Sequence, residues 1–393
     1  MPVARLDDLL AEGVRGRRVF VRADLNVPLR DGEVADDTRI RASLPSLRRL
    51  ADAGARVVVA SHLGRPKGER RPELSLRAVS VRLGELLDRP VAFAPDCVGT
   101  EAQRVVDALG DGDVALLENL RFHAGETAND PEFARQLAAL ADLYVNDAFG
   151  TAHRAHASTV GMVAHVSRAA AGDLLAAELE HLRVVLEPRR PLLCFLGGAK
   201  VSDKLAVLEA LAPHADVLAV GGAMAYTFLR ARGEPTGESL VEDAQVAEAR
   251  RVLDAAESAG RRLLLPTDHV VARELRDDAE HRTVKQIPDG WMGLDIGPET
   301  AATYAAEAAR AGTIFWNGPM GVFEIEAFAS GTREVARAVA TSDATSVVGG
   351  GDSLAAINQL GLGNRIDHLS TGGGASLEYV QGMTLPGVAA LES

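Results

Sequence analysis

The sequence predicts an α/β protein of two lobes, each built around a mainly parallel sheet. Short apolar runs rich in Val, Leu and Ala recur along the chain, and a stretch with the apolar spacing of an amphipathic helix follows each of them. The runs are unbroken rather than alternating, which is typical of parallel strands buried on both faces. In repeated strand–helix units of this kind, function is expected at the carboxyl ends of the strands.

The predicted elements repeat in both halves of the chain. In the first half the strands occupy residues 17–24, 55–62, 113–119 and 142–149. In the second half they occupy residues 191–198, 216–222, 261–268, 312–318 and 345–351. Amphipathic helices are predicted over 38–54 and 130–142, the second with Pro131 near its first turn.

A long helical stretch near the middle divides the chain. Residues 169–188 contain no predicted strand and end at Pro188. Glycine use changes across this stretch, with 14 glycines before residue 173 and 24 after it. We therefore expect a first lobe over 1–168, a connecting helix over 169–188 and a second lobe over 189–375.

The overall composition argues against several classes of protein. With 47% hydrophobic and 25% charged residues, the 393-residue chain has the balance of a globular protein. Its net charge of −13 disfavours nucleic-acid or anionic-membrane binding, and no apolar run has the length of a membrane span. The first residues lack the pattern of a secretion signal, and Cys97 and Cys194 are too few for a disulfide framework or a four-ligand zinc site. We expect a cytoplasmic protein.

In the first lobe, basic side chains follow the predicted strands. They are His62, Arg65, Arg121, Arg154 and His156, with Arg39 at the start of a helix. Guanidinium groups bind carboxylates and phosphates bidentately, so convergent arginines predict a small, multiply charged anion as ligand. Asp24 and Asn26 would bind a hydroxyl group or position the arginines. The alternative is that each arginine lies on a solvated face, but their recurrence at successive strand ends favours a site.

Two other kinds of chemistry are disfavoured in this lobe. His62, His123, His153 and His156 could bind a metal, but the sequence has no HExxH motif and no cysteine beside them. A Ser-His-Asp triad would need a nucleophile elbow, and no GxSxG is present.

In the second lobe, glycine-rich segments follow the strands. They occupy residues 197–200, 221–224, 317–324, 349–353 and 371–376. One such segment is often only a tight turn, but five of them predict backbone N–H groups that approach the phosphate chain of a nucleotide. A Walker A motif is absent because Ala199 precedes the lysine, and no GxGxxG fingerprint is present.

Two of the four lysines of the chain, Lys200 and Lys204, lie four residues apart, where the first turns of a helix are expected. Like charges at this spacing repel each other, and both oppose the helix dipole, so a bound polyphosphate would explain the pair. Asp203 would temper the repulsion if the pair has no ligand. Asp352 is the best candidate for holding Mg²⁺ with phosphates, or it caps a helix over 353–360. Glu324 would accept hydrogen bonds from ribose hydroxyls, or it lies in an exposed turn.

Taken together, the motifs resemble the phosphoglycerate kinase family. The matching segments, in family order, are RADLNVPL, DDTRIRASLPSL, SHLGRPKG, ENLRFHAGE, VNDAFGTAHRAHAS, FLGGAKVSDKL, WNGPMGVFE, GGGDSLAAI and STGGGASLE. They extend from about residue 5 to residue 388. The resemblance implies two Rossmann-like lobes joined by a helix, an active site in the cleft between them, hinge bending, and a tail over about 376–393 that packs on the first lobe. It also implies a cytoplasmic, monomeric enzyme of glycolysis.

The implied reaction is reversible phosphoryl transfer from 1,3-bisphosphoglycerate to ADP, which yields 3-phosphoglycerate and ATP with Mg²⁺. By matching positions, the acid would be bound by Asp24, Asn26, Arg39, His62, Leu63, Gly64, Arg65, Arg121 and Arg154. The nucleotide would be bound by Lys204, Gly293, Asn317, Glu324, Gly350, Gly351, Asp352 and Ser353, with Asp352 on the metal. Arg39 and Lys200 would stabilise the transferring phosphoryl group together with the turn at Gly372, Gly373 and Gly374.

The sequence departs from the family pattern at a few positions. Ala223 replaces the third glycine of a frequent GGGM, a small change, and Gln381 and Met383 replace an acidic residue and a lysine near the tail. Two other functions are compatible with a two-lobed α/β chain but fit these residues less well. A small-molecule binding protein would not require the lysine pair or Asp352, and a nicotinamide dehydrogenase would require the missing fingerprint.

Overall fold

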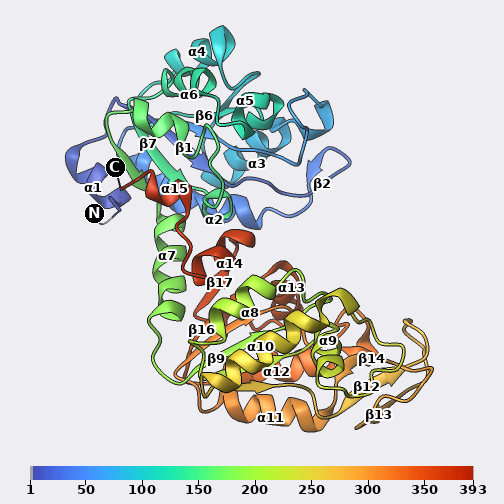
Figure 1. Ribbon diagram of the computed structural model, residues 1–393. Helices are drawn as coiled ribbons and strands as arrows, with labels where there is room; N and C mark the ends of the chain where they lie inside the picture. Colours follow the sequence, from blue (N-terminus) through green and yellow to red (C-terminus); the bar gives the residue numbers. More distant parts are fainter. Residues whose placement is uncertain (1–2, 393) are drawn as a thin grey trace. The chain divides into compact units, whose positions relative to one another are not determined.

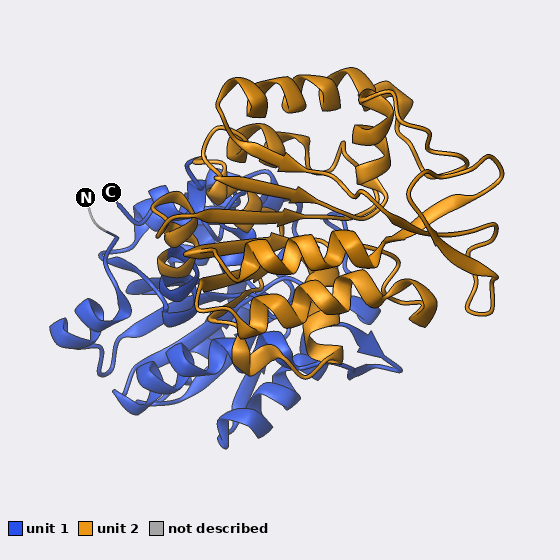
Figure 2. Ribbon diagram, turned by 90° about the horizontal axis from the view of Figure 1, so that it is seen from below, with its two compact units in different colours: residues 1–179, 384–393 blue, residues 180–383 orange. Residues whose placement is uncertain are grey.

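The computed structural model describes residues 3–392, so residues 1–2 of the predicted first lobe and residue 393 of the predicted tail lie outside it. The chain forms two compact units, residues 1–179 with 384–393 and residues 180–383 (Figures 1 and 2). Each unit contains a six-stranded parallel sheet, which confirms the predicted α/β class. No helix among the described residues is long and apolar enough to cross a membrane.

Unit 1 is built on the strand order β5-β6-β4-β1-β7-β8. The strands are β1 (Arg18–Ala23), β4 (Arg56–Ala60), β5 (Val91–Ala94), β6 (Val114–Leu117), β7 (Leu143–Asp147) and β8 (Ala169–Ala171), with a hairpin of β2 (Leu29–Arg30) and β3 (Glu33–Val34). In the central strand, Val19 pairs with Val57 of β4 on one side and with Leu143 of β7 on the other. Five of the six residues of β1 are buried, as expected for a strand covered on both faces.

Helices cover the sheet of unit 1. They are α1 (Leu6–Glu12), α2 (Thr38–Asp52), α3 (Arg77–Leu87), α4 (Gly99–Asp107), α5 (Ala124–Thr127), α6 (Pro131–Ala138) and α15 (Pro386–Ala389), with 3-10 turns η1 (Pro72–Leu74), η2 (Leu120–Phe122), η3 (Phe149–Thr151) and η4 (Gly161–His165). Pro131 is the first residue of α6, and the side chain of Asp130 caps that helix at the N–H of Phe133 (2.8 Å).

The C-terminal segment 384–393 belongs to unit 1, although the chain forms the whole of unit 2 before it. The amide Nδ2 of Asn146, in β7, donates a hydrogen bond to the carbonyl of Gly387 (3.2 Å). The N–H of Gly387 donates to the carbonyl of Ala152 (2.8 Å), and a Cβ on Gly387 would meet the Cα of Ala152 at 3.0 Å. This tail is the red helix α15 in Figure 1. Met383, just before the tail, is 51% exposed.

Unit 2 is built on the strand order β11-β10-β9-β15-β16-β17. The strands are β9 (Leu192–Leu196), β10 (Val217–Val220), β11 (Arg262–Leu264), β15 (Thr313–Asn317), β16 (Thr345–Gly349) and β17 (His368–Ser370). The helices are α8 (Leu205–Leu211), α9 (Met224–Ala231), α10 (Val246–Ser258), α11 (Pro298–Ala308), α12 (Ser330–Thr341), α13 (Gly351–Gln359) and α14 (Gly374–Val380), with 3-10 turns η5 (Asp243–Gln245), η6 (Glu326–Phe328) and η7 (Gly363–Arg365).

Unit 2 also contains a small antiparallel sheet that the sequence did not predict. Its strands are β12 (His269–Ala272), β13 (His281–Val284) and β14 (Met292–Ile296), with β12 in the middle. Three of the four residues of β13 are exposed, so this strand lacks the apolar run by which the other strands were recognised.

The helical prediction for 169–188 is wrong at its start. Residues 169–171 form β8, which pairs with β7, and Ala171 also bridges to Arg5. The helix α7 (Asp173–Leu186) begins two residues later, because the buried carboxylate of Asp147 accepts hydrogen bonds from the N–H groups of Leu174 (2.9 Å) and Leu175 (3.2 Å).

Candidate functional site

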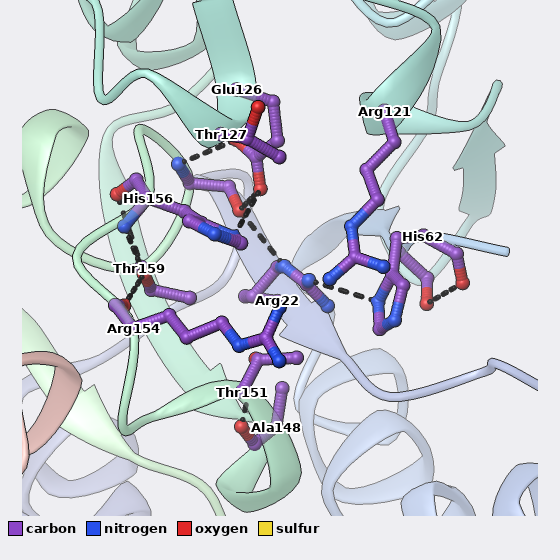
Figure 3. Close-up of polar contacts among 12 residues, drawn as sticks. Arg22, His62, Arg121, Glu126, Thr127, Ala148, Thr151, Arg154, His156 and Thr159 are labelled. Carbon is purple, nitrogen blue, oxygen red and sulfur yellow. Dashed lines mark hydrogen bonds and ion pairs between the residues drawn. The ribbon is translucent and has the colours of Figure 1, made fainter. Parts of the chain in front are cut away.

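Unit 1 contains a cluster of basic side chains at the carboxyl ends of its strands, which we call the basic cluster. Figure 3 shows Arg22 of β1 lying among basic side chains from other segments. They are His62 after β4, Arg121 in η2, and Arg154 and His156 after η3. Parallel strands end at one edge of a sheet, and this is how residues far apart in the sequence come together.

Arg22 lies at the centre of the basic cluster and was not predicted from the sequence. Its side chain is fully buried, and its Nε donates a hydrogen bond to Oγ of Ser158 (2.9 Å). One of its terminal nitrogens lies 3.2 Å from Nδ1 of His62. Arg22 lies within a mostly apolar strand. A strand of a sheet buried on both faces was expected to be apolar throughout, so Arg22 was not recognised as a candidate site residue.

A buried carboxylate compensates part of this charge. Glu126 of α5 is fully buried and accepts hydrogen bonds from Oγ (2.6 Å) and from the backbone N–H (3.0 Å) of Ser158. The hydroxyl of Ser158 therefore links Arg22 to Glu126. Glu126 and the nearby Asp24 offset only part of the charge of several guanidinium groups, so the basic cluster keeps an excess of positive charge.

Burial and the neighbouring positive charges together shift the pKa values of the cluster. Burial and the neighbouring Arg22 and Arg154 lower the pKa of Arg121 to about 10. Burial, followed by the positive charges of Arg121 and Arg22, lowers the pKa of His156 to about 4, and similar causes hold the pKa of His62 well below its usual range. Groups that repel one another in this way are suited to binding an anion.

The remaining predicted residues of the acid site lie beside the basic cluster. Oδ1 of Asn26 accepts a hydrogen bond from the N–H of Gly64 (2.9 Å), whose carbonyl accepts one from Arg121 (2.9 Å). Arg39, the second residue of α2, pairs with Asp24 at 2.5 Å. Leu63 is buried, and its N–H donates a hydrogen bond to Oδ1 of Asn119 (3.2 Å). The side chains of Arg65 and Arg154 are exposed.

Substitution of His156 is expected to reduce the loss of stability in acid. Between its ordinary pKa near 6.5 and its folded pKa near 4, the unfolded chain binds a proton that the folded chain does not, so stability falls as the pH drops. From pH 7 to pH 5, His156→Gln should lose about 2 kcal/mol less than the parent in urea titrations, at about 1.4 kcal/mol per pKa unit. The matched control is His214→Gln, an exposed histidine of unit 2. Equal losses in His156→Gln and the parent would contradict this electrostatic account.

The strand ends of unit 2 approach one another so closely that only glycine fits. A Cβ on Gly197, after β9, would lie 2.0 Å from the carbonyl oxygen of Pro319, which follows β15. A Cβ on Gly222, after β10, would lie 2.6 Å from the backbone of Gly198. These glycines bring three loops together, so they have a packing role in addition to any contact with a ligand.

Lys204 lies among these loops, in a place that differs from the prediction. The helix α8 begins at Leu205, with Lys204 as its N-cap residue, so Lys200 and Lys204 lie on a loop and not on the first turns of a helix. Nζ of Lys204 donates to Oδ1 of Asn317, at the end of β15. Burial lowers the pKa of Lys204, while the charges of Asp203 and Asp352 act in the opposite direction.

Lys200 is exposed and lies near another carboxylate. Burial acts to raise the pKa of Glu242, but hydrogen bonds from Ser202 and, to a smaller extent, the charge of Lys200 lower it. The N–H (3.0 Å) and the hydroxyl (2.6 Å) of Ser202 both donate to Glu242. The loop that carries the two lysines is therefore fixed between Glu242 on one side and Asn317 on the other.

The segment after β16 provides the features that a metal-bound phosphate chain requires. Gly350, with a φ of +90°, is the N-cap residue of α13, so Asp352 lies inside the first turn and is not the cap predicted as one of its roles. Asp352 is exposed, and a Cβ on Gly351 would meet open space. Ser353 is buried and its Oγ accepts from the N–H of Gly318 (2.6 Å).

An unpaired polar group supports the fit of this segment to a phosphate and Mg²⁺. Nδ2 of Asn317 is buried and has no hydrogen-bond partner among the described residues. Such a donor is costly unless a ligand accepts from it. Mg²⁺ usually takes one or two carboxylates and completes its coordination with phosphates and water, so the single exposed Asp352 fits that group.

The other residues predicted for the nucleotide and for the transferring phosphoryl group come from three segments of unit 2. Gly293 in β14 has no room for a side chain, because a Cβ there would lie 2.2 Å from the hydroxyl of Tyr226. Glu324 is exposed. The segment before it is held to β14 by a hydrogen bond from the N–H of Val322 to the carbonyl of Leu294 (2.9 Å). Gly373, with a φ of +56°, precedes Gly374 at the start of α14, which packs against α8.

Comparisons with known proteins agree over the whole chain. The family model described as phosphoglycerate kinase matches residues 6–383. The chain is 58% identical to the phosphoglycerate kinase of Salinispora tropica over all of both chains, and 59% identical to that of Rubrobacter xylanophilus over 96% of each. Its fold matches the structure of phosphoglycerate kinase from Coxiella burnetii with a TM-score of 0.91 and 42% identity, covering 100% of this chain and 99% of that one.

Proposed function

The chain belongs to the phosphoglycerate kinase family and has its activity, and from that premise we propose that unit 1 binds the acid substrate and unit 2 the nucleotide. The enzyme transfers a phosphoryl group reversibly between 1,3-bisphosphoglycerate and ADP, a step of glycolysis. The carboxyl group of 3-phosphoglycerate is the acceptor in the reverse direction. The observation that carries the proposed division is the difference in chemistry between the two sets of strand ends.

In unit 1, we assign the acid to the basic cluster and its neighbours. The excess positive charge around Arg22 and Arg121 suits a ligand that has both a phosphate and a carboxylate. Asp24 and Asn26 are available for the hydroxyl group. The residues assigned to the acid are Asp24, Asn26, Arg39, His62, Leu63, Gly64, Arg65, Arg121 and Arg154, to which the buried position of Arg22 adds a further one.

In unit 2, we assign the phosphate chain to Lys204, the free amide of Asn317 and the turn at Gly350 and Gly351. Mg²⁺ bound to the phosphates through Asp352 would neutralise part of their charge. Glu324 and Gly293 are assigned to the nucleoside, and Ser353 fixes the loop after β15.

Catalysis in this proposal is mainly the positioning of charge. Phosphoryl transfer needs no general base here, because the attacking oxygen is already anionic. Arg39 and Lys200 would stabilise the charge on the moving phosphoryl group, and the N–H groups of Gly373 and Gly374 would add hydrogen bonds. We also propose a cytoplasmic monomer, and light scattering of the purified protein tests its mass.

The proposed division is tested by titration of each substrate separately. Arg121→Ala should weaken the binding of 3-phosphoglycerate and leave MgADP binding unchanged, whereas Lys204→Ala should do the reverse. Isothermal calorimetry measures both affinities, and a coupled assay of ATP-dependent phosphorylation of 3-phosphoglycerate measures turnover. A variant that weakens both ligands equally while it remains folded would contradict the division.

Binding on separate units predicts a conformational change during turnover. In-line transfer requires reacting atoms about 3–3.5 Å apart and shielded from water. Neither substrate alone contacts both sets of residues, so neither alone should drive the change fully. We expect small-angle scattering to show a smaller radius of gyration with 3-phosphoglycerate and a MgATP analogue together than with either ligand. An unchanged radius in an enzyme that turns over would contradict this prediction.

A further inference from the structure

A second group of chemically active side chains lies in unit 1, apart from the residues assigned to the substrates. Asp96 and Cys97 follow β5, and His123 lies between η2 and α5. A carboxylate oxygen, the Sγ atom and an imidazole nitrogen of these residues all lie within 4.8 Å of one another. Among the residues that the structure describes, this is the one group of three or more such side chains with ligand-like spacing.

The three side chains differ in their exposure to solvent. Cys97 is fully buried, while the side chains of Asp96 and His123 are 31% and 32% exposed. An ion that arrives from solvent would first meet the carboxylate and the imidazole, and would then reach the thiol below them.

The neighbours of the three residues hold them in place. Oδ1 of Asp96 lies 2.7 Å from Nε2 of His123 and accepts a hydrogen bond from the N–H of Cys97 (2.7 Å). Arg70 pairs with the other oxygen of Asp96 (3.0 Å), and the ring of Phe133 stacks on His123 at 5.2 Å. Interactions of this kind orient the ligands of metal sites.

We propose that Asp96, Cys97 and His123 form a binding site for a zinc-class divalent ion. One oxygen, one sulfur and one nitrogen ligand are a set that Zn²⁺ and Co²⁺ accept, and water would complete four-coordination. Mg²⁺ prefers oxygen ligands alone, so this site is chemically distinct from the one assigned to Asp352. On binding, the S–H bond of Cys97 breaks, a metal–sulfur bond forms, the proton passes to the buffer, and Nε2 of His123 turns from Asp96 to the metal.

The test uses the full, metal-free protein without nucleotide. Addition of Co²⁺ should produce the near-ultraviolet charge-transfer band of a cobalt–thiolate bond, and Zn²⁺ should abolish that band by competition. Calorimetry should then give one Zn²⁺ site that Cys97→Ala and His123→Ala each weaken by at least about 100-fold, since loss of a direct ligand exceeds the effect of a neighbouring residue. Cys194→Ala removes the other buried thiol, on β9 in unit 2, and should leave band and affinity unchanged.

Either of two results would overturn the proposal. One is the absence of a thiolate band in the parent protein, which would assign Asp96 and His123 to a structural ion pair. The other is an unchanged Zn²⁺ affinity in Cys97→Ala. Circular dichroism and turnover with Mg²⁺, 3-phosphoglycerate and ATP verify that each variant is folded. Because metal binding and turnover are measured separately, failure of the proposed substrate sites would not be mistaken for failure of this site.

Discussion

Replacement of Arg39 by alanine is expected to lower kcat by about 10²–10³-fold while MgATP affinity stays nearly unchanged, because loss of one transition-state donor costs about 3–4 kcal/mol. Arg39 is the second residue of α2, and its side chain is 37% exposed although it pairs with Asp24. One terminal nitrogen is occupied by that pair, so other donors of the guanidinium group remain for a phosphoryl group. Steady-state kinetics and calorimetry separate the two effects.

Two variants control for the loss of a charge on this helix. Arg39→Lys keeps the charge but not the planar arrangement of donors, and should restore little activity. Arg41→Ala removes an exposed arginine two residues further along α2, where it pairs with Asp37 at 2.7 Å. It should turn over like the parent. If Arg39→Ala retains kcat within threefold of the parent, the catalytic role assigned to Arg39 is wrong.

Replacement of Asp352 by asparagine is expected to weaken MgADP and MgATP binding by at least tenfold, about 1.4 kcal/mol, with 3-phosphoglycerate binding unchanged. Asp352 is the carboxylate in the first turn of α13, beside the open turn at Gly350 and Gly351. Asparagine keeps the shape of the side chain and removes the charge that Mg²⁺ prefers. Calorimetric titrations with and without Mg²⁺ measure the effect, which should disappear when Mg²⁺ is omitted.

Asp343→Asn is a suitable control for the loss of a negative charge in unit 2. Asp343 is exposed and lies on the loop before β16, where its backbone carbonyl accepts a hydrogen bond from Arg189 (2.6 Å). This variant should bind both nucleotides like the parent. A loss of 3-phosphoglycerate affinity in Asp352→Asn would indicate a folding defect and would argue against a local role at the metal.

The parallel sheets could be predicted because burial on both faces imposes continuous apolar runs. The runs around Val19, Val57 and Ile314 lie in β1, β4 and β15, at or near the centres of their sheets. The edge strands β5, β8 and β17 were missed, whereas the edge strand β11 was predicted. Ala169–Ala171 has the composition of a helix, but pairing with β7 and the bridge to Arg5 override alanine's helix propensity.

Predicting the candidate sites depended on the distance in sequence between their parts. Strand-end residues such as His62 and Arg121 could be grouped because parallel topology brings strand ends together. The helical placement of Lys200 and Lys204 was wrong, because residues 201–204 form a turn before α8. That loop is held by Glu242 and Asn317, and both lie far away in the sequence. Cys97 and His123 are likewise far apart in the sequence. The sequence argument against zinc relied on nearby cysteines, so it did not anticipate that their ligand atoms lie within 4.8 Å of each other.

The return of residues 384–393 to unit 1 has a consequence during protein synthesis. The ribosome makes the strands of unit 1 first, but the segment that contains Gly387 leaves it only after all of unit 2. Until then, the amide of Asn146 and the carbonyl of Ala152 lack the partners that Gly387 provides. Unit 2 therefore has its whole sequence before unit 1 does. The part of the enzyme that is translated first is completed last, so a chain that stalls within residues 384–393 has an unfinished unit 1 and a unit 2 whose sequence is complete.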